Sequence, residues 1–333
     1  MTATLPPPNF AAEVYLDSLT HFGIQLGLTR INALLDVLGE PQQQIPIVHV
    51  AGTNGKGSVC ALVSHAIAAA GYRVGRYTSP HLVDWRERIW VGGESISPEE
   101  WRSVLWRVKQ ASYAYPADLD PPTQFEIVTA AAWLHFRQVA VDIAVVEVGL
   151  GGRLDSTNAG IAPCVSAIAS IGWDHWQRLG NSLEAIAAEK AGIIRSGIPV
   201  VSAPQMPAVR EVIAARAREL NAPLTVVKPA EAIALDRACW QGKTYPRPLA
   251  GTVQLENLAI ALQVLETLRQ QGWTLPDRAI QVGLAAASWP GRLEWVNLCN
   301  REVCSTERTT FQRRSRCASI SIVYRRLINR RRG

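Results

Sequence analysis

The chain has 333 residues, of which 48% are hydrophobic and 19% are charged, a composition typical of globular proteins with a sizeable core. Its first ten residues lack the basic and apolar segments of a signal peptide. The longest apolar stretch, around 139–150, is interrupted by Asp142 and Glu147, which argues against a transmembrane helix. Six cysteines without C-x-x-C spacing indicate neither a zinc site nor a disulfide framework. We therefore expect a cytoplasmic protein without a membrane partner.

The net charge of +6 and the pI near 9.1 suggest nucleic-acid binding. The charge is unevenly distributed, however, because residues 297–333 hold ten arginines, no lysine and two acids, a local balance of +8. The other 296 residues carry a net charge of −2. Nucleic-acid binding thus fits only this basic tail, and we predict no nucleic-acid partner for the body of the protein.

Apolar, β-branched runs alternate with longer amphipathic patterns along the chain. Strands are predicted at 47–50, 74–78, 143–148, 165–170, 199–202 and 224–227. Helices are predicted at 58–70, 99–114, 125–137, 182–191 and 208–220. This alternation predicts an α/β fold with a mostly parallel sheet flanked by helices. Ligands of such sheets bind beyond the carboxyl ends of the strands, and Gly52, Ser79, Glu147 and His175 each lie at or just after such an end.

The first predicted strand leads into the segment H-V-A-G-T-N-G-K-G-S-V, in which Gly52, Gly55 and Gly57 surround Lys56. Glycines let backbone N–H groups converge on phosphate oxygens at a helix N-terminus. Lys56 would then reach the outer phosphates, and the Ser58 hydroxyl would ligate Mg²⁺. The spacing departs from the common P-loop, because Gly57 separates the lysine from the serine. A glycine-rich turn without function is the alternative.

Other residues at strand ends are ambiguous by themselves. Glu147 lies in an apolar strand, where an unpaired carboxylate is costly, so it needs either a magnesium ion beside phosphates or a salt bridge such as one to Arg153. Ser79 precedes a proline in Y-T-S-P-H-L and is a turn residue by default. A lone histidine such as His175 is usually structural. Lys190 falls in the last turn of a predicted helix, where its charge suits the helix dipole.

That helix follows N-S-L-E, so Asn181 and Glu184 are expected to form a capping box, with Gly192 as the C-cap.

The G-T-N-G-K-G-S string resembles the ATP loop of the Mur ligase superfamily, and within it the folylpolyglutamate synthase/dihydrofolate synthase family. Further similar motifs follow in the family's order over roughly residues 13–296: L-G-L-T-R-I, T-S-P, G-G-R-L-D-S-T-N, G-W-D-H, E-K-A-G-I, Q-L-E-N-L-A and P-G-R-L-E. A peptidoglycan Mur ligase shares the loop chemistry, but the G-L-G-G-R-L-D-S-T-N and E-K-A-G-I strings favour the folate family.

The resemblance implies the central-domain fold of the Mur ligases, with ATP and Mg²⁺ as cofactors. It implies a ligase that converts the carboxylate of folate or dihydropteroate into an acyl phosphate, which the amine of L-glutamate attacks. The implied metal ligands are Ser58, Ser79, Glu147 and His175. The implied catalytic residues are Lys56, His175 and Lys190, the last being carbamylated in family members. The implied nucleotide contacts are Gly52, Thr53, Asn54, Gly55, Lys56, Gly57, Ser58, Asn257 and Arg292.

The pterin side of the substrate is assigned to Gln124, Phe125 and the segment 26–30. We further expect a monomer.

The resemblance stops after P-G-R-L-E, where the family continues into a second domain that opens with L-D-G-A-H-N-P. Residues 303–310 can be encoded by the codons GTG TGC TCG ACG GAG CGC ACA ACC, which read V-L-D-G-A-H-N when the first two bases are dropped. We therefore expect an ATP-binding domain at 1–296 and an aberrant, disordered basic tail at 297–333, frameshifted from roughly 298–303 onward. A natural basic tail is the alternative. We expect the ligase activity of this chain to be impaired. The alternative interpretation is that the chain is a catalytically inactive nucleotide-binding fragment.

Overall fold

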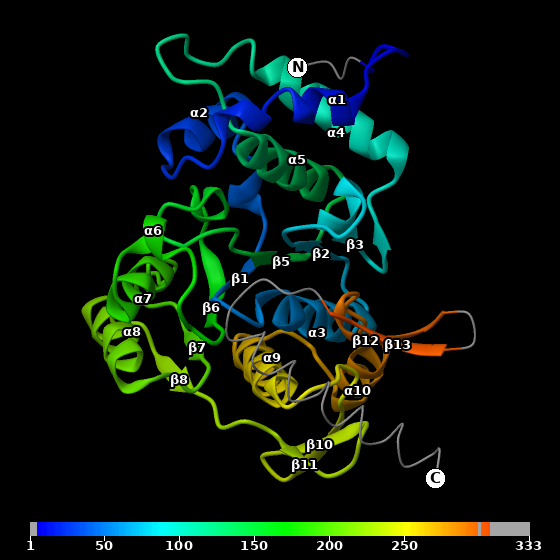
Figure 1. Cartoon of the computed structure of the whole chain (residues 1–333), viewed down its shortest axis with the longest axis vertical. Coiled ribbons are helices and arrows are strands. Elements are labelled where there is room, and N and C mark those ends of the chain that lie inside the picture. The colour runs from blue at the N-terminus through cyan, green and yellow to red at the C-terminus, as the bar shows by residue number, and fades with distance from the viewer. Residues whose placement is uncertain (1–4, 299–300, 307–333) are drawn as a thin grey trace.

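The computed structural model describes the backbone of residues 5–298 and 301–306 and the side chains of residues 5–291. Its main sheet is built from eight strands: β1 (Ile47–Ala51), β2 (Val74–Tyr77), β3 (Ile89–Val91), β4 (Glu94–Ser95), β5 (Ile143–Glu147), β6 (Pro163–Ile168), β7 (Val200–Ser202) and β8 (Leu224–Val226). They lie in the order β4-β3-β2-β5-β1-β6-β7-β8 (Figure 1). The strands from β2 to β8 in this order pair in parallel, whereas β3 and β4 form an antiparallel edge. The predicted α/β fold and all six predicted strands are confirmed.

The helices lie on both faces of this sheet (Figure 1). They are α1 (Ala12–Asp17), α2 (Thr29–Val37), α3 (Lys56–Ala69), α4 (Pro98–Ala111), α5 (Gln124–Gln138), α6 (Trp176–Leu179), α7 (Leu183–Ala191), α8 (Pro207–Glu219), α9 (Val253–Gln270) and α10 (Asp277–Ala286). Short 3₁₀ helices are η1 (Thr20–Phe22), η2 (Pro41–Gln44), η3 (Trp85–Arg88) and η4 (Ser156–Asn158). No helix in the described part of the chain is long and apolar enough to span a membrane.

Side chains alternate across the central strand, and this alternation divides the core into layers. Val48 and Val50 of β1 pack into the cluster that contains α3, α9 and α10. Ile47 points to the opposite face, which α2, α4 and α5 cover, and Ala51 meets α7 and α8 on that same face. Because helices cover both faces, the central strands carry continuous apolar runs rather than alternating ones. The carboxyl ends of β1, β2, β5 and β6 remain as the shared edge on which the predicted site residues lie.

The start of α7 differs from the prediction. Its N-cap is Ser182, whose hydroxyl accepts a hydrogen bond from the backbone N–H of Ala185 at 3.1 Å. The predicted capping box of Asn181 and Glu184 is therefore wrong by one residue, and alanine at the third helical position offers no side chain to complete a box. Gly192 is the C-cap, as predicted.

Two small sheets were not predicted. One is β9 (Glu231–Ala232), β10 (Arg237–Trp240) and β11 (Lys243–Pro246), and the other is the antiparallel pair β12 (Arg292–Leu298) and β13 (Arg301–Thr306). Strand β12 crosses the predicted boundary between 296 and 297, and β13 lies where no regular element was expected. A hairpin is held by backbone hydrogen bonds between its strands, so it can form without a clear apolar period. The predicted disorder of residues 307–333 concerns positions outside the described residues.

Candidate active site

A cavity of about 350 Å³ lies at the carboxyl ends of the central strands. Loops after β1, β2, β5 and β6 contribute to it, together with the segment before α2 and the start of α5. It brings together eleven residues singled out from the sequence: Leu26, Thr53, Gly55, Lys56, Gly57, Ser79, Gln124, Phe125, Glu147, His175 and Lys190. Residues from each of the three predicted groups, for phosphate, metal and pterin, therefore line the same cavity.

Four of the residues predicted to bind nucleotide or metal do not line this cavity, namely Gly52, Asn54, Ser58 and Asn257, and neither do residues 27–30 of the predicted pterin segment. The Ser58 hydroxyl is buried and accepts a hydrogen bond from Gln254 Nε2 at 3.3 Å. Gln254 in turn accepts a bond from Asn257 Nδ2 at 2.8 Å, so α9 supports the first turn of α3 from behind. The Arg292 side chain lies outside the described residues.

The glycine-rich loop after β1 is shaped by close contacts. Gly52 and Gly55 have φ angles of 149° and 92°, a region that favours glycine. A Cβ at Gly55 would collide with the Asn257 amide, and one at Gly57 would lie 2.6 Å from the Trp289 ring. The loop therefore needs glycines both for its conformation and for its packing against elements that are distant in sequence.

Lys56 and Glu147 form the charged centre of the cavity. Lys56 Nζ donates to Gly52 O at 3.1 Å and to Thr53 O at 3.4 Å, and it lies 3.9 Å from Glu147 Oε1. Glu147 is only 4% exposed, and its other oxygen accepts a hydrogen bond from the Ser79 backbone N–H at 3.2 Å. Arg153, the alternative partner of Glu147 in the sequence analysis, instead binds Glu189 at 2.7 Å.

His175 reaches the cavity from the loop after β6. It is the N-cap of α6 with a left-handed φ of 47°, and its half-exposed ring lies 3.8 Å from Asp174. Across residues 5–291, no three His, Cys, Asp or Glu side chains form a ready metal cluster. Mg²⁺ in phosphate-binding sites usually takes one or two carboxylates, with waters and phosphate oxygens as the other ligands. The buried Glu147 carboxylate and the Ser79 hydroxyl, which line the same cavity, are oxygen donors that fit this set, whereas the His175 imidazole on that cavity is not a typical Mg²⁺ ligand.

Lys190 projects from the last turn of α7 into the back of the phosphate loop. It is 3% exposed, and its Nζ donates to Gly52 O at 3.0 Å. Burial, reinforced by the charge of Lys56, lowers the pKa of Lys190 to about 7. At neutral pH a sizeable fraction of this amine is therefore unprotonated, which is the form that can react as a nucleophile. A role limited to the helix dipole, which sufficed from the sequence, does not explain this burial.

Among the lining residues that sequence reasoning did not single out are the charged residues Asp155 and Arg88. Asp155 is fully buried and accepts hydrogen bonds from Leu150 N at 2.7 Å and from Thr157 Oγ1 at 2.6 Å. Burial raises the pKa of Asp155. Arg88 enters from η3, stacked over the Trp85 ring at 4.4 Å. Asp155 stands inside the G-G-R-L-D-S-T-N motif, which was a usable signal, whereas nothing in the local pattern around Arg88 indicated a site.

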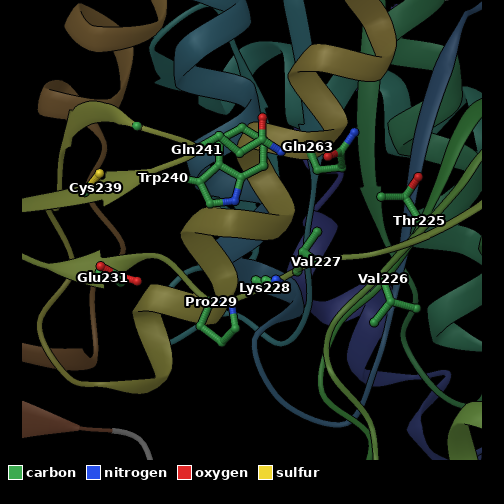
Figure 2. Close-up of a pocket in the computed structure, with 11 residues that line it drawn as sticks. Thr225, Val226, Val227, Lys228, Pro229, Glu231, Cys239, Trp240, Gln241 and Gln263 are labelled. Carbon is green, nitrogen blue, oxygen red and sulfur yellow. The ribbon is translucent and has the colours of Figure 1, made fainter.

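A second cavity, of about 500 Å³, lies between the open edge of β8, the strands β9 and β10, and α9. Figure 2 shows Trp240 and Gln241 on one side of it, and Gln263 of α9 behind. None of its lining residues belongs to a motif identified in the sequence. We therefore assign the chemistry to the smaller cavity.

The parallel sheet, the glycine-rich loop after its central strand and the cavity beyond it define a P-loop α/β protein with the Mur ligase type of fold.

No family model matches the chain. It is 39% identical over 300 residues to the dihydrofolate synthase/folylpolyglutamate synthase of Bacillus subtilis, covering 86% of this chain and 70% of that protein. A solved folylpolyglutamate synthase of Mycobacterium tuberculosis, complexed with ADP and AMPPCP, matches with a TM-score of 0.79 and 34% identity over 90% of this chain and 71% of that one. A complex described as FPGS–AMPPCP–folate matches with a TM-score of 0.80 and 36% identity, over 89% and 75% of the two chains.

The chain belongs to the folylpolyglutamate synthase/dihydrofolate synthase family. This membership confirms the family resemblance and sets aside the peptidoglycan ligases. The chain spans 70%, 66%, 66% and 64% of the length of four curated relatives.

Proposed function

We propose that this protein is an ATP-dependent ligase that joins L-glutamate to the carboxylate of a folate or of dihydropteroate. The observation that carries the proposal is the convergence of the phosphate-loop lysine, a buried carboxylate and a low-pKa lysine in one cavity. Family membership and the nucleotide and folate complexes of related proteins support it. We also propose that the protein is a monomer and that it is located in the cytoplasm.

The phosphate loop would bind the triphosphate. Its N–H groups at the N-terminus of α3 favour anions, and Lys56 would move from the Gly52 and Thr53 carbonyls to the outer phosphates. The glycines at 55 and 57 let the loop pack closely against Asn257 and Trp289, so Asn257 lies directly behind the loop. Asn257 and Arg292 are proposed to complete the nucleotide site.

Ser79, Glu147 and His175, with Ser58 beside the loop, would hold Mg²⁺. Bound Mg²⁺ would neutralise charge on the transferred phosphoryl group. The protein's own contribution is position: β5 brings Glu147 between the loops of β1 and β2, and the Ser79 backbone N–H fixes the carboxylate. The substrate carboxylate would attack the outer phosphorus of ATP and release ADP. The amine of L-glutamate would then displace phosphate from the acyl phosphate to form the amide, while the cavity limits access of water.

Lys190 is proposed to be carbamylated. Its neutral amine could add CO₂ with release of a proton, and the resulting carbamate would be an anion close to the positive charge of Lys56. Mass spectrometry of the intact protein in bicarbonate, compared with Lys190→Arg, would detect an added mass of one CO₂ only in the wild-type chain. Equal spectra would contradict carbamylation.

The test of the activity is incorporation of labelled L-glutamate into dihydropteroate and into tetrahydrofolate, with ATP and Mg²⁺. We expect ADP release coupled to ligation and no product without Mg²⁺. ATP binding without ligation of either acceptor would favour the second candidate, a catalytically inactive nucleotide-binding protein. The observation behind that candidate is the lack of an L-D-G-A-H-N-P motif after P-G-R-L-E.

We propose that the chain divides into an ATP-binding domain at 1–296 and an aberrant tail at 297–333. The DNA sequence around codons 296–305 tests it directly, because a frameshift predicts V-L-D-G-A-H-N in the adjacent frame. A version with the frame restored should ligate glutamate faster than the 333-residue chain. Equal turnover by the two proteins would show that the tail does not impair the ligase activity.

A further inference from the structure

Arg88 lies on the side of the cavity opposite the phosphate loop. In the sheet, β5 separates β2 from β1, so Glu147 at the end of β5 lies between the loop that follows β1 and the segment that follows β2. Arg88 belongs to that latter segment, and its backbone carbonyl accepts a hydrogen bond from Thr78 N at 3.0 Å. The residue is thereby anchored next to Ser79.

The Arg88 guanidinium is held in a fixed place. Its Nε donates to His81 Nδ1 at 2.9 Å, its plane stacks on Trp85, and it hydrogen bonds to the Tyr77 hydroxyl. The acidic residues of its own segment are engaged elsewhere: Asp84 binds Arg86, and Glu87 accepts bonds from the backbone N–H groups of 82–84. Arg88 also interacts electrostatically with Glu147 and with Glu87 of its own segment, so the guanidinium contributes a positive charge to the cavity near Glu147.

The cavity's cations divide into two groups. Lys56 and Lys190 both donate to Gly52 O and so belong to the phosphate side. Among the described residues that line the cavity, Arg88 is the cation on the β2 side, where the Tyr77 ring lies 6.3 Å from that of Phe125. An anionic substrate that enters next to Glu147 and Asp155 needs a positive charge on this side. A guanidinium binds a carboxylate through two parallel, charge-assisted hydrogen bonds.

We propose that Arg88 binds the substrate carboxylate that is to be activated and presents it beside Glu147, facing the phosphate loop. The ligand class is an aryl or alkyl carboxylate attached to a pterin whose ring lies toward Phe125. This inference rests on the proposed function, because it assigns the acceptor end of the same site.

Binding measurements separate this proposal from the proposed function. Affinities for pteroic acid and for its neutral methyl ester are measured by calorimetry on the full chain with Mg²⁺ and AMPPCP present. The wild-type chain should prefer the acid at least about tenfold, equivalent to about 1.4 kcal/mol. Arg88→Gln should remove that preference by weakening acid binding, while Arg88→Lys should retain part of it. AMPPCP affinity should stay unchanged in both variants, which also reports that they fold.

Arg86→Gln is the matched control, since Arg86 lies on the same 3₁₀ helix, pairs with Asp84 and does not line the cavity. It should leave the preference for the acid intact. A preference that survives in Arg88→Gln, or that is lost equally in Arg86→Gln, would overturn the assignment of Arg88. Wild-type binding of acid and ester with equal affinity would overturn it while leaving the proposed function standing. Failure of the wild-type chain to bind either compound would overturn both.

Discussion

The two cavities described above differ in what lines them more than in size. The larger one at the β8 edge is built mainly from exposed or neutral side chains, among them Lys228 and Gln241. The smaller one holds the buried Glu147, Asp155 and Lys190. Buried ionisable groups are costly unless they serve a purpose, so their gathering locates chemistry better than volume does. The first two predictions below compare a residue of the smaller cavity with a residue of the larger one. The third tests a buried charge of the smaller cavity.

The largest expected effect is on nucleotide affinity. Lys56→Ala removes the cation that faces the phosphates, and we expect the affinity for Mg²⁺-AMPPCP to fall about 100-fold, near 2.7 kcal/mol. Ser58→Ala should weaken binding less, because that hydroxyl is buried against Gln254. Lys228→Ala, at the second cavity, should change nothing. Calorimetry on the three variants checks this, and unchanged affinity in Lys56→Ala and Ser58→Ala would remove the phosphate assignment of the loop.

The second prediction compares two glycines. Gly55 and Gly242 both have positive φ angles, 92° and 76°, but only Gly55 has a side chain in the path of a Cβ, whereas nothing lies within 4 Å of one at Gly242. Alanine at either site should cost about 1 kcal/mol of unfolding free energy through backbone strain. Gly55→Ala should cost more, because it displaces Asn257, and should also weaken AMPPCP binding. Urea unfolding and calorimetry measure the two effects. Equal costs at the two sites would show that Asn257 does not restrain the loop.

The third prediction concerns pH. Because the pKa of Lys190 is about 7 in the folded chain and near 10.5 when unfolded, the unfolded chain binds more protons between these values. Stability should therefore rise from pH 7 to about 10.5, with a contribution of up to about 1.4 kcal/mol per pH unit. Below pH 7 this contribution is constant. Urea unfolding in CO₂-free buffer should show a shallower slope over this range in Lys190→Met. Identical slopes would mean that the lysine is not held neutral by burial.

Much of the candidate site could be predicted, because the positions of its residues along the chain follow from local sequence patterns. Apolar runs located the parallel strands, and the chain order of strand, glycines and helix located the phosphate loop. Parallel strands bring their carboxyl ends to one edge, so Ser79, Glu147 and His175 could be expected near one another. The exact start of α7 could not be predicted, because both Asn181 and Ser182 are acceptable caps.

The sequence by itself determined the sheet, the loop and the family, since these follow from periodicity and from motifs contiguous in the chain. Only the tertiary structure decided where side chains from distant segments meet. Lys190 is buried against Gly52 because α7 packs beside the loop after β1, and Asn257 and Trp289 back the loop glycines because α9 and the segment after α10 lie under α3. Arg88 faces the cavity because the segment after β2 folds back onto Thr78. Contacts of this kind depend on the packing of whole elements, which no local pattern specifies.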